Sequence, residues 1–196
     1  MSFILKDADD TIALGRMLAE AMSCSSVRDL YLFADLGGGK TTLTRGFVSA
    51  LPGGENAEVA SPSFTLCNIY PTRPEVLHAD LYRLSEGAFL PEDMEELMEE
   101  GNALLVLEWP EYLARERYAG ERLEVRLVHQ QGNIEELFEN NGQKSEHVTP
   151  LKSLDNADKS CKSFRLATLE AHGPAAESLL GSLLPRLSQR FMPVKA

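Results

Sequence analysis

The spacing of apolar residues predicts helices in four segments of the chain. In the second of them, Leu43, Phe47 and Leu51 lie four residues apart, which places them on one face of a helix. The last of them begins with Gly173 followed by Pro174, a typical helix start. We expect the four helices at residues 9–22, 41–51, 90–100 and 174–190, of which the third is strongly acidic.

Shorter runs between these helices have the composition of β-strands. Leu30–Phe33 and Ala103–Leu107 are uninterrupted apolar runs, as expected of strands buried on both faces. Residues 123–128 alternate between apolar and charged, which predicts a half-exposed strand, and 164–169 is a weaker strand candidate. The order of helices and strands indicates an α/β protein.

Two further strands are expected at residues 63–70 and 76–82, joined by a short segment with proline at both ends. A connection this short favours antiparallel pairing. Strand alternation places His78, Asp80 and Tyr82 on one face of the second strand. We interpret Tyr82 and Phe64 as core residues.

Residues 130–160 are polar and rich in turn-forming residues. A stretch of roughly thirty residues without secondary structure is long for a compact domain. We therefore interpret this segment as a mobile insertion within a single domain that spans residues 1–196.

The charge balance limits the possible partners. The chain has 19 Lys and Arg against 30 Asp and Glu, a formal net charge of -11. Such a surface repels the nucleic-acid backbone and anionic membranes, and no apolar stretch is long enough to span a bilayer. The three cysteines are widely spaced, which fits reduced thiols, so we expect a cytoplasmic protein.

Other charged residues suggest no separate site. The arginines between residues 115 and 126 alternate with glutamates, which is typical of a mixed charged surface. The four histidines lack the spacing of metal ligands, and we expect structural or surface roles for them: His78, His129, His147 and His172.

A glycine-rich run, Ala34–Thr42, carries the clearest chemistry. It follows the pattern GxxxxGKS/T between a strand and a helix, which is typical of a phosphate-binding P-loop. The residues Gly37, Gly38 and Gly39 allow successive N–H groups to converge on phosphate oxygens, helped by the N-terminus of the helix. The alternative is a glycine-rich turn with an incidental lysine.

Each residue after the glycines has an expected contact. Lys40 would supply a charge to the β and γ phosphates, Thr41 would place its hydroxyl on Mg²⁺, and Thr42 would reach toward the α phosphate. The first glycine of the pattern is replaced by Ala34, so this turn must tolerate a Cβ atom.

A P-loop site needs a carboxylate at the end of a neighbouring strand. Glu108 directly follows an apolar strand, although an ordinary solvated strand end is the alternative. Asp80 lies within a half-apolar strand, where an unpaired acid is costly, and a salt bridge to Arg83 or another base is the alternative.

Four motifs in this order, ADLGGGKTT, SPSFTL, HADLYRL and LEWPE, resemble the TsaE (YjeE) ATPases. These proteins act in bacterial synthesis of the threonylcarbamoyl modification on adenosine 37 of tRNA. The resemblance covers about residues 9–128. It implies a P-loop NTPase fold with three layers, in which helices flank a mixed parallel and antiparallel central sheet.

The resemblance also implies slow, partner-stimulated ATP hydrolysis with ATP and Mg²⁺. The implied partners are TsaB and TsaD, with tRNA contacted only indirectly and no membrane. It implies that Lys40, Asp80 and Glu108 are catalytic and that Thr41, Asp80 and Glu108 serve the metal. The nucleotide-binding residues that it implies are Asp35, Leu36, Gly37, Gly38, Gly39, Lys40, Thr41, Thr42, Thr11 and Trp109.

Three features depart from the family pattern: Ala34 in the loop, Ser63 in place of threonine in a switch-like segment at 61–65, and the long segment 130–160. Two other functions remain open from the residues. A small-molecule kinase would use the same loop, and a nucleotide-dependent binding module would hydrolyse ATP only incidentally. GTP is disfavoured because the chain contains no NKxD motif.

Overall fold

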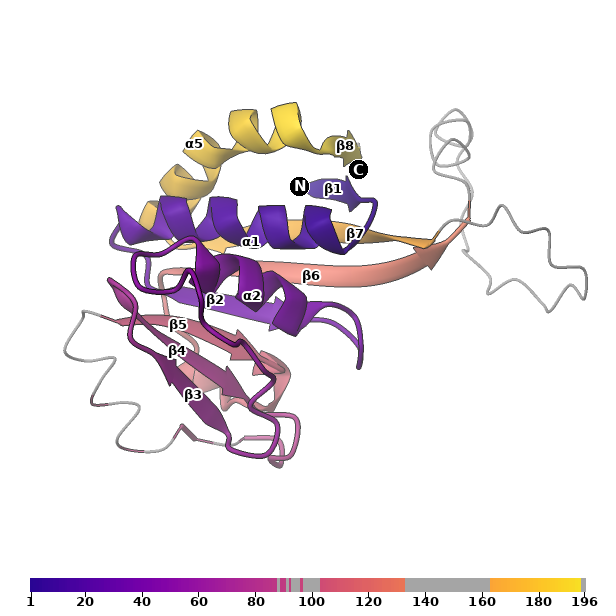
Figure 1. Cartoon of the computed structure of the whole chain (residues 1–196). Helices are drawn as coiled ribbons and strands as arrows, with labels where there is room; N and C mark the ends of the chain where they lie inside the picture. Colours follow the sequence, from indigo (N-terminus) through magenta and orange to yellow (C-terminus); the bar gives the residue numbers. More distant parts are fainter. Residues whose placement is uncertain (88, 91, 93–95, 97–102, 133–162, 195–196) are drawn as a thin grey trace, which may run out of the picture.

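The computed structural model describes residues 1–87, 89–90, 92, 96, 103–132 and 163–194. Three long helices alternate with strands along this part of the chain (Figure 1). The helices are α1 (Ala8–Ser23), α2 (Lys40–Ser49) and α5 (Pro174–Arg190), with short 3-10 helices η1 (Pro110–Tyr112) and η2 (Arg115–Arg117). The strands are β1 (Ser2–Leu5), β2 (Asp29–Phe33), β3 (Cys67–Tyr70), β4 (Glu75–Asp80), β5 (Ala103–Glu108), β6 (Arg122–Gln131), β7 (Ser163–His172) and β8 (Met192–Val194).

The described strands form one mixed sheet in the order β3-β4-β5-β2-β6-β7-β1-β8. The centre is parallel, because β2 pairs with β5 and β6 in parallel and β4 pairs with β5 in parallel. Both edges are antiparallel: β3 pairs with β4, β7 with β6, and β1 with β7 and β8. As a result, β2, β4 and β5 end side by side at one edge of the sheet.

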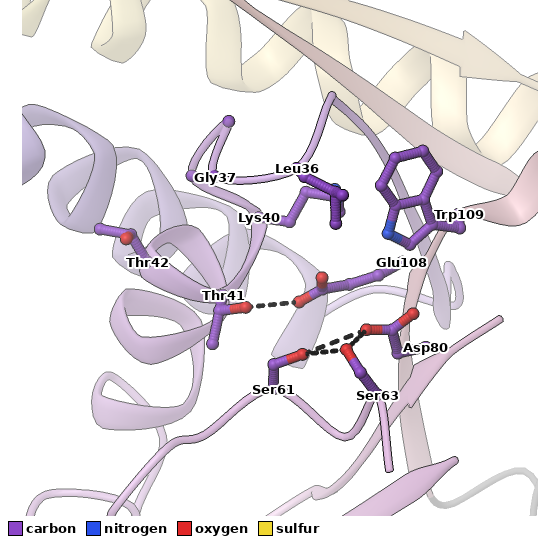
Figure 2. Close-up of a pocket in the computed structure, with 12 residues that line it drawn as sticks. Leu36, Gly37, Lys40, Thr41, Thr42, Ser61, Ser63, Asp80, Glu108 and Trp109 are labelled. Atoms are coloured by element: carbon purple, nitrogen blue, oxygen red, sulfur yellow. Dashed lines mark hydrogen bonds between the residues drawn. The ribbon is translucent and has the colours of Figure 1, made fainter. Parts of the chain in front are cut away.

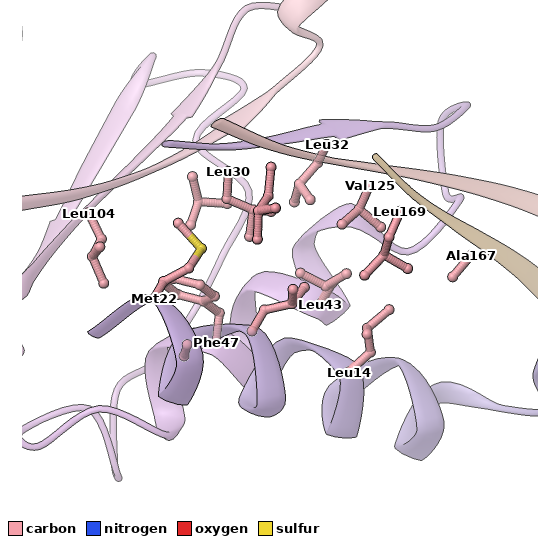
Figure 3. Close-up of a cluster of buried hydrophobic side chains, with 14 of the residues drawn as sticks. Leu14, Met22, Leu30, Leu32, Leu43, Phe47, Leu104, Val125, Ala167 and Leu169 are labelled. Atoms are coloured by element: carbon pink, nitrogen blue, oxygen red, sulfur yellow. The ribbon is translucent and has the colours of Figure 1, made fainter. Parts of the chain in front are cut away.

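The helices α1, α2 and α5 cover one face of this sheet (Figure 1), and their apolar side chains merge with those of the strands into one core. Figure 3 shows the part of this core that α1 and α2 form with the strands. The helices α1 and α2 cross at two glycines. A Cβ atom on Gly15 would lie 2.1 Å from the Leu43 carbonyl oxygen, and one on Gly46 would lie 2.1 Å from that of Ile12. Only glycine permits this close approach, which fixes α2 and the loop before it.

A second buried cluster covers the other face and completes three layers. Tyr31, Leu105 and Leu107 of the sheet are almost fully buried there. They pack against Leu113, which follows η1, and against the half-buried Tyr118. The protein is therefore a three-layer α/β fold around a mixed sheet. None of its described helices is long and apolar enough to cross a membrane.

Most predicted elements are confirmed within two residues at each end, except that β6 and β7 extend three residues beyond their predicted C-terminal ends. The prediction of a strand from residue 63 is wrong, because β3 begins at Cys67. The backbone N–H groups of Thr65 and Leu66 both donate to the Pro62 carbonyl, which closes a turn, and Leu66 has a left-handed φ of 68°. The β4 strand likewise ends at Asp80 rather than at residue 82.

The prediction that Phe64 and Tyr82 belong to the core is also wrong. Phe64 is 85% exposed and Tyr82 is 39% exposed, because both lie in turns beyond the strands that were expected to bury them. The short strands β1 and β8 were not predicted. The predicted helix at 90–100 and the insertion at 130–160 lie largely outside the described residues, although 130 and 131 belong to β6.

Candidate functional site

The glycine-rich loop connects the end of β2 to the start of α2. Gly37 and Gly39 have left-handed φ values of 74° and 108°, which glycine adopts without strain. Gly39 is the N-cap of α2, and no described side chain caps it. The first N–H groups of α2 therefore lack the side-chain acceptor that most helices supply, an arrangement that suits an anion.

The loop geometry explains how Ala34 replaces the expected glycine. A Cβ atom on Gly38 would lie 2.7 Å from the Ala34 Cβ atom and 2.9 Å from the Asp35 carbonyl oxygen. Ala34 itself has no left-handed backbone angle, so its side chain causes no strain there. Position 34 therefore tolerates a Cβ atom, whereas position 38 requires glycine.

Lys40 begins α2 and turns its side chain back over the loop. Its Nζ atom donates to the carbonyl oxygens of Ala34 at 2.7 Å and Asp35 at 3.2 Å, and lies 3.9 Å from the centre of the Trp109 ring. Burial lowers the pKa of Lys40, while the nearby carboxylates, Glu108 foremost, raise it. The ammonium group is thus partly desolvated and lies near two acids, Glu108 and Asp80.

Glu108 ends β5 and faces the start of α2. Its side chain is 3% exposed, and its Oε1 atom accepts a hydrogen bond from the Thr41 hydroxyl at 3.1 Å. The same oxygen lies 2.8 Å from Nε2 of His78, which is fully buried. The alternative of a solvated glutamate at a strand end is therefore wrong.

Asp80 ends β4 and binds the turn that precedes β3. Its Oδ2 atom accepts hydrogen bonds from the hydroxyls of Ser61 and Ser63, and its Oδ1 atom accepts one from the Tyr82 N–H. Ser63 therefore supplies the hydroxyl that the expected threonine would have supplied. Arg83 lies over the Phe64 ring at 4.1 Å, so the alternative of a salt bridge to Asp80 is not what the structure shows.

These groups meet because β4 and β5 are parallel neighbours. Asp80 and Glu108 are register partners, so both acids leave the sheet at the edge where the loop lies. The two acids and the glycine-rich loop line a cavity of about 240 Å³ (Figure 2). Its described lining residues are Leu36, Gly37, Gly38, Gly39, Lys40, Thr41, Thr42, Ser61, Ser63, Asp80, Glu108 and Trp109.

Ten of these lining residues were predicted as site residues, and two predicted residues are placed elsewhere. Asp35 is exposed and contributes its backbone carbonyl to Lys40 and to the Gly38 N–H. Thr11 is fully buried in α1, where its hydroxyl donates to the Asp7 carbonyl at 3.0 Å. The geometry gives no support to a nucleotide contact by the Thr11 side chain.

The chemistry of the cavity fits a polyphosphate and a hard divalent cation. The loop N–H groups and Lys40 are donors for phosphate oxygens, whereas the Thr41 hydroxyl and the carboxylates of Asp80 and Glu108 are oxygen ligands of the kind that Mg²⁺ prefers. A second group of possible ligands in the described part of the chain is Glu124, Glu170 and His172. There the Arg122 guanidinium already donates to the Glu124 carboxylate at 2.8 Å.

Two residues near the site were not predicted as site residues. His78 was assigned only a structural or surface role, yet it contacts Glu108 directly. Arg165 of β7 donates from Nε to the Gly38 carbonyl oxygen at 3.0 Å, across 127 positions of sequence. Neither contact follows from local spacing, because each depends on the order of strands in the sheet.

Comparison with known proteins gives consistent matches. Residues 5–137 match the family of the threonylcarbamoyl adenosine biosynthesis protein TsaE. The TsaE protein of Streptomyces coelicolor is 35% identical over 117 residues, which are 58% of this chain and 76% of that protein. The TsaE protein of Aquifex aeolicus is 36% identical over 109 residues, which are 55% of this chain and 75% of that protein.

A solved structure shows the same fold. The crystal structure of YdiB from Bacillus subtilis superposes with a TM-score of 0.60 at 22% identity and covers 95% of each chain. The match to the family extends over more than half of the sequence and includes every residue of the cavity. This chain belongs to the TsaE family, whose members act in the biosynthesis of threonylcarbamoyladenosine in tRNA.

Proposed function

We propose that this chain binds ATP with Mg²⁺ and hydrolyses it in the synthesis of threonylcarbamoyladenosine in tRNA. One observation carries the proposal: Lys40 and Thr41 open a helix directly opposite two carboxylates, Asp80 and Glu108, in one cavity. A phosphate-binding turn alone would need only the loop. The two acids at neighbouring strand ends supply what a phosphoryl-transfer site requires in addition.

Phosphate binding would exchange one set of hydrogen bonds for another. Lys40 would leave the carbonyls of Ala34 and Asp35 and pair with phosphate oxygens, with which its charge forms stronger bonds. The N–H groups of Gly39 and the first turn of α2 would point at the same phosphates. Trp109 would form the apolar wall beside Lys40.

The acids would have separate tasks. The Thr41 hydroxyl donates a hydrogen bond to the Glu108 carboxylate, so this pair of oxygen ligands would hold Mg²⁺. Asp80 would hold either the metal shell or the attacking water, next to the serines of the turn. Bound Mg²⁺ would neutralise charge on the phosphates, which is the principal contribution of a metal in phosphoryl transfer.

The segment 61–65 would respond to the nucleotide. Ser61 and Ser63 are held by Asp80, so any change at Asp80 is passed directly to this turn and to the exposed Phe64. We propose that ATP and Mg²⁺ order the segment and that hydrolysis relaxes it. The expected partners are proteins of the TsaB and TsaD type. Contact with tRNA would be indirect, in keeping with the net charge of -11.

The kinase alternative receives less support from the cavity. Kinases that act on small molecules usually close over the phosphates with arginines, whereas Lys40 is the one basic side chain among the described lining residues.

Reconstitution tests the proposal. The chain is combined with TsaB- and TsaD-type proteins, ATP, Mg²⁺, tRNA and a source of the threonylcarbamoyl group, and modified adenosine is measured. Modification should depend on the chain, on hydrolysable ATP and on Lys40, with Lys40→Ala inactive. Sustained modification with Lys40→Ala would refute the ATPase role.

A further inference from the structure

Arg165 reaches the glycine-rich loop from a strand far away in sequence. It lies near the start of β7, where Leu5 of β1 and His129 of β6 are its register partners. Its Nε atom donates to the Gly38 carbonyl oxygen at 3.0 Å. A Cβ atom on Gly39 would lie 3.0 Å from this Nε and 3.6 Å from the central guanidinium carbon, so the side chain packs directly against the loop.

The position of this charge is unusual. Arginine is permanently charged, and Gly39 is the N-cap of α2, where the helix dipole is positive. Lys40 adds a further positive charge one residue later. In the described part of the chain, the ion pairs do not include Arg165. Three positive features thus converge on one turn, which favours the binding of a highly charged anion there.

The contact also restrains the loop backbone. The Gly38 carbonyl bonded by Arg165 belongs to the peptide whose N–H is that of Gly39. Holding this carbonyl fixes the plane of the peptide and therefore the direction of that N–H group. Arg165 does not belong to the described lining of the cavity, so any effect on a ligand would pass through the loop rather than through direct contact.

We propose that Arg165 is a positioning residue for phosphate binding: it orients the Gly38–Gly39 peptide and adds positive potential to the loop. This inference rests on the proposed function of the same site. It predicts a preference for ligands with more phosphate charge. If Arg165 only stabilised β7, its replacement would change the affinity for all nucleotides by the same factor or leave all affinities unchanged.

The test uses the only tryptophan of the chain, Trp109, which lies 3.9 Å from the Lys40 ammonium group and should report nucleotide binding by its fluorescence. ATP, ADP and AMP are titrated with Mg²⁺ into the wild type, Arg165→Gln and Arg165→Lys. Arg186→Gln is the matched control, because Arg186 is an exposed arginine that pairs with Glu20 on the helical layer. Thermal unfolding without nucleotide checks that each variant is folded.

Arg165→Gln should raise the Kd for ATP about tenfold and that for ADP several-fold, with that for AMP nearly unchanged. Arg165→Lys keeps the charge but loses the fixed Nε donor, so it should raise the Kd for ATP by roughly threefold. It also carries the test if the glutamine variant does not fold. Arg186→Gln should match the wild type.

The outcomes separate the two proposals. Wild-type protein that binds no nucleotide would overturn the proposed function and this inference together. Wild-type binding of ATP with an unchanged Kd in both Arg165 variants would overturn only the role of Arg165. An equal loss of affinity for ATP and AMP would also overturn it, because a general structural defect makes no distinction by phosphate number.

Discussion

His78 Nε2 lies 2.8 Å from Glu108 Oε1 in a part of the protein where neither side chain is more than 3% exposed. The Thr41 hydroxyl binds the same carboxylate oxygen from the opposite element, α2. On its other side, the His78 ring stacks on Tyr70 with ring centres 6.3 Å apart. Glu108 is therefore fixed between β4 and α2, with its orientation set by a histidine that does not line the cavity.

Replacement of His78 by phenylalanine should impair turnover more than binding. The phenyl ring keeps the stacking on Tyr70 but cannot hydrogen-bond to Glu108, so the carboxylate loses its orientation. We expect kcat to fall about tenfold or more with the KM for ATP nearly unchanged. Steady-state phosphate release gives both values.

The matched control is Tyr70→Phe, because no described group bonds the buried Tyr70 hydroxyl. Its kinetics should equal those of the wild type. His78→Gln, which retains a donor, should recover part of the lost kcat. A His78→Phe variant with wild-type kcat would show that the histidine only fills space.

Glu108→Gln should separate binding from hydrolysis. The amide keeps the volume but loses the negative charge that would serve the metal and that accepts the hydrogen bond from the Thr41 hydroxyl. We expect nucleotide still to bind, as Trp109 fluorescence would report, while turnover falls about 100-fold. Glu111→Gln, on the adjacent η1 helix and exposed, is the control. Normal turnover by Glu108→Gln would reject the role given to this acid.

Gly38→Ala should damage the loop, and Ala34→Gly should repair part of the damage. The new Cβ atom would meet the Ala34 Cβ atom at 2.7 Å and the Asp35 carbonyl at 2.9 Å. The second substitution removes only the first of these contacts. We expect the Kd for ATP to rise at least about tenfold in Gly38→Ala and to recover partly in the double variant.

Calorimetric titration of the four proteins, including Ala34→Gly alone, measures this coupling. Ala34→Gly alone should bind as the wild type does. Additive effects of the two substitutions would contradict the explanation of Ala34 given by the loop geometry.

The site could be predicted from sequence only in part. The loop, Lys40 and Thr41 follow from a local pattern, since strand, turn and helix are consecutive. Glu108 could be placed at a strand end and Asp80 only within a strand, and their adjacency depends on β4 and β5 being parallel neighbours. No spacing rule gives that order, and the same holds for Arg165 at the loop.

The errors in the fold have a similar origin. Residues 63–66 have strand-like composition, but they form a turn because the N–H groups of Thr65 and Leu66 both donate to the Pro62 carbonyl. That turn is what brings Ser61 and Ser63 to Asp80. The edge strands β1 and β8 are too short for a pattern to appear, and they exist because they pair with each other and, through β1, with β7.

Asp29 should make stability depend on pH. Burial raises its pKa from 3.8 to about 6, an effect that Arg122 only partly offsets. Because the folded-state pKa is the higher one, this group's contribution to stability is fully present below pH 3.8 and is lost as pH rises through about 6. Between about pH 5 and pH 7.5, the free energy of unfolding should fall by about 1 kcal/mol from this group.

Urea unfolding at the two pH values measures this change in the free energy of unfolding. Asp29→Asn should remove that part of the pH dependence and be more stable than the wild type at the higher pH. Glu116→Gln, at an exposed acid of η2, should retain it. An identical pH dependence in Asp29→Asn and the wild type would show that Asp29 titrates normally.

ATP hydrolysis is the most direct test of the central claim that Lys40 and Glu108 serve one catalytic site. Phosphate release from ATP is measured with Mg²⁺ for the wild type, Lys40→Ala and Glu108→Gln, with and without TsaB- and TsaD-type proteins. We expect slow release by the wild type that the partners accelerate, and nearly none by either variant. Equal release by all three proteins would contradict the central claim.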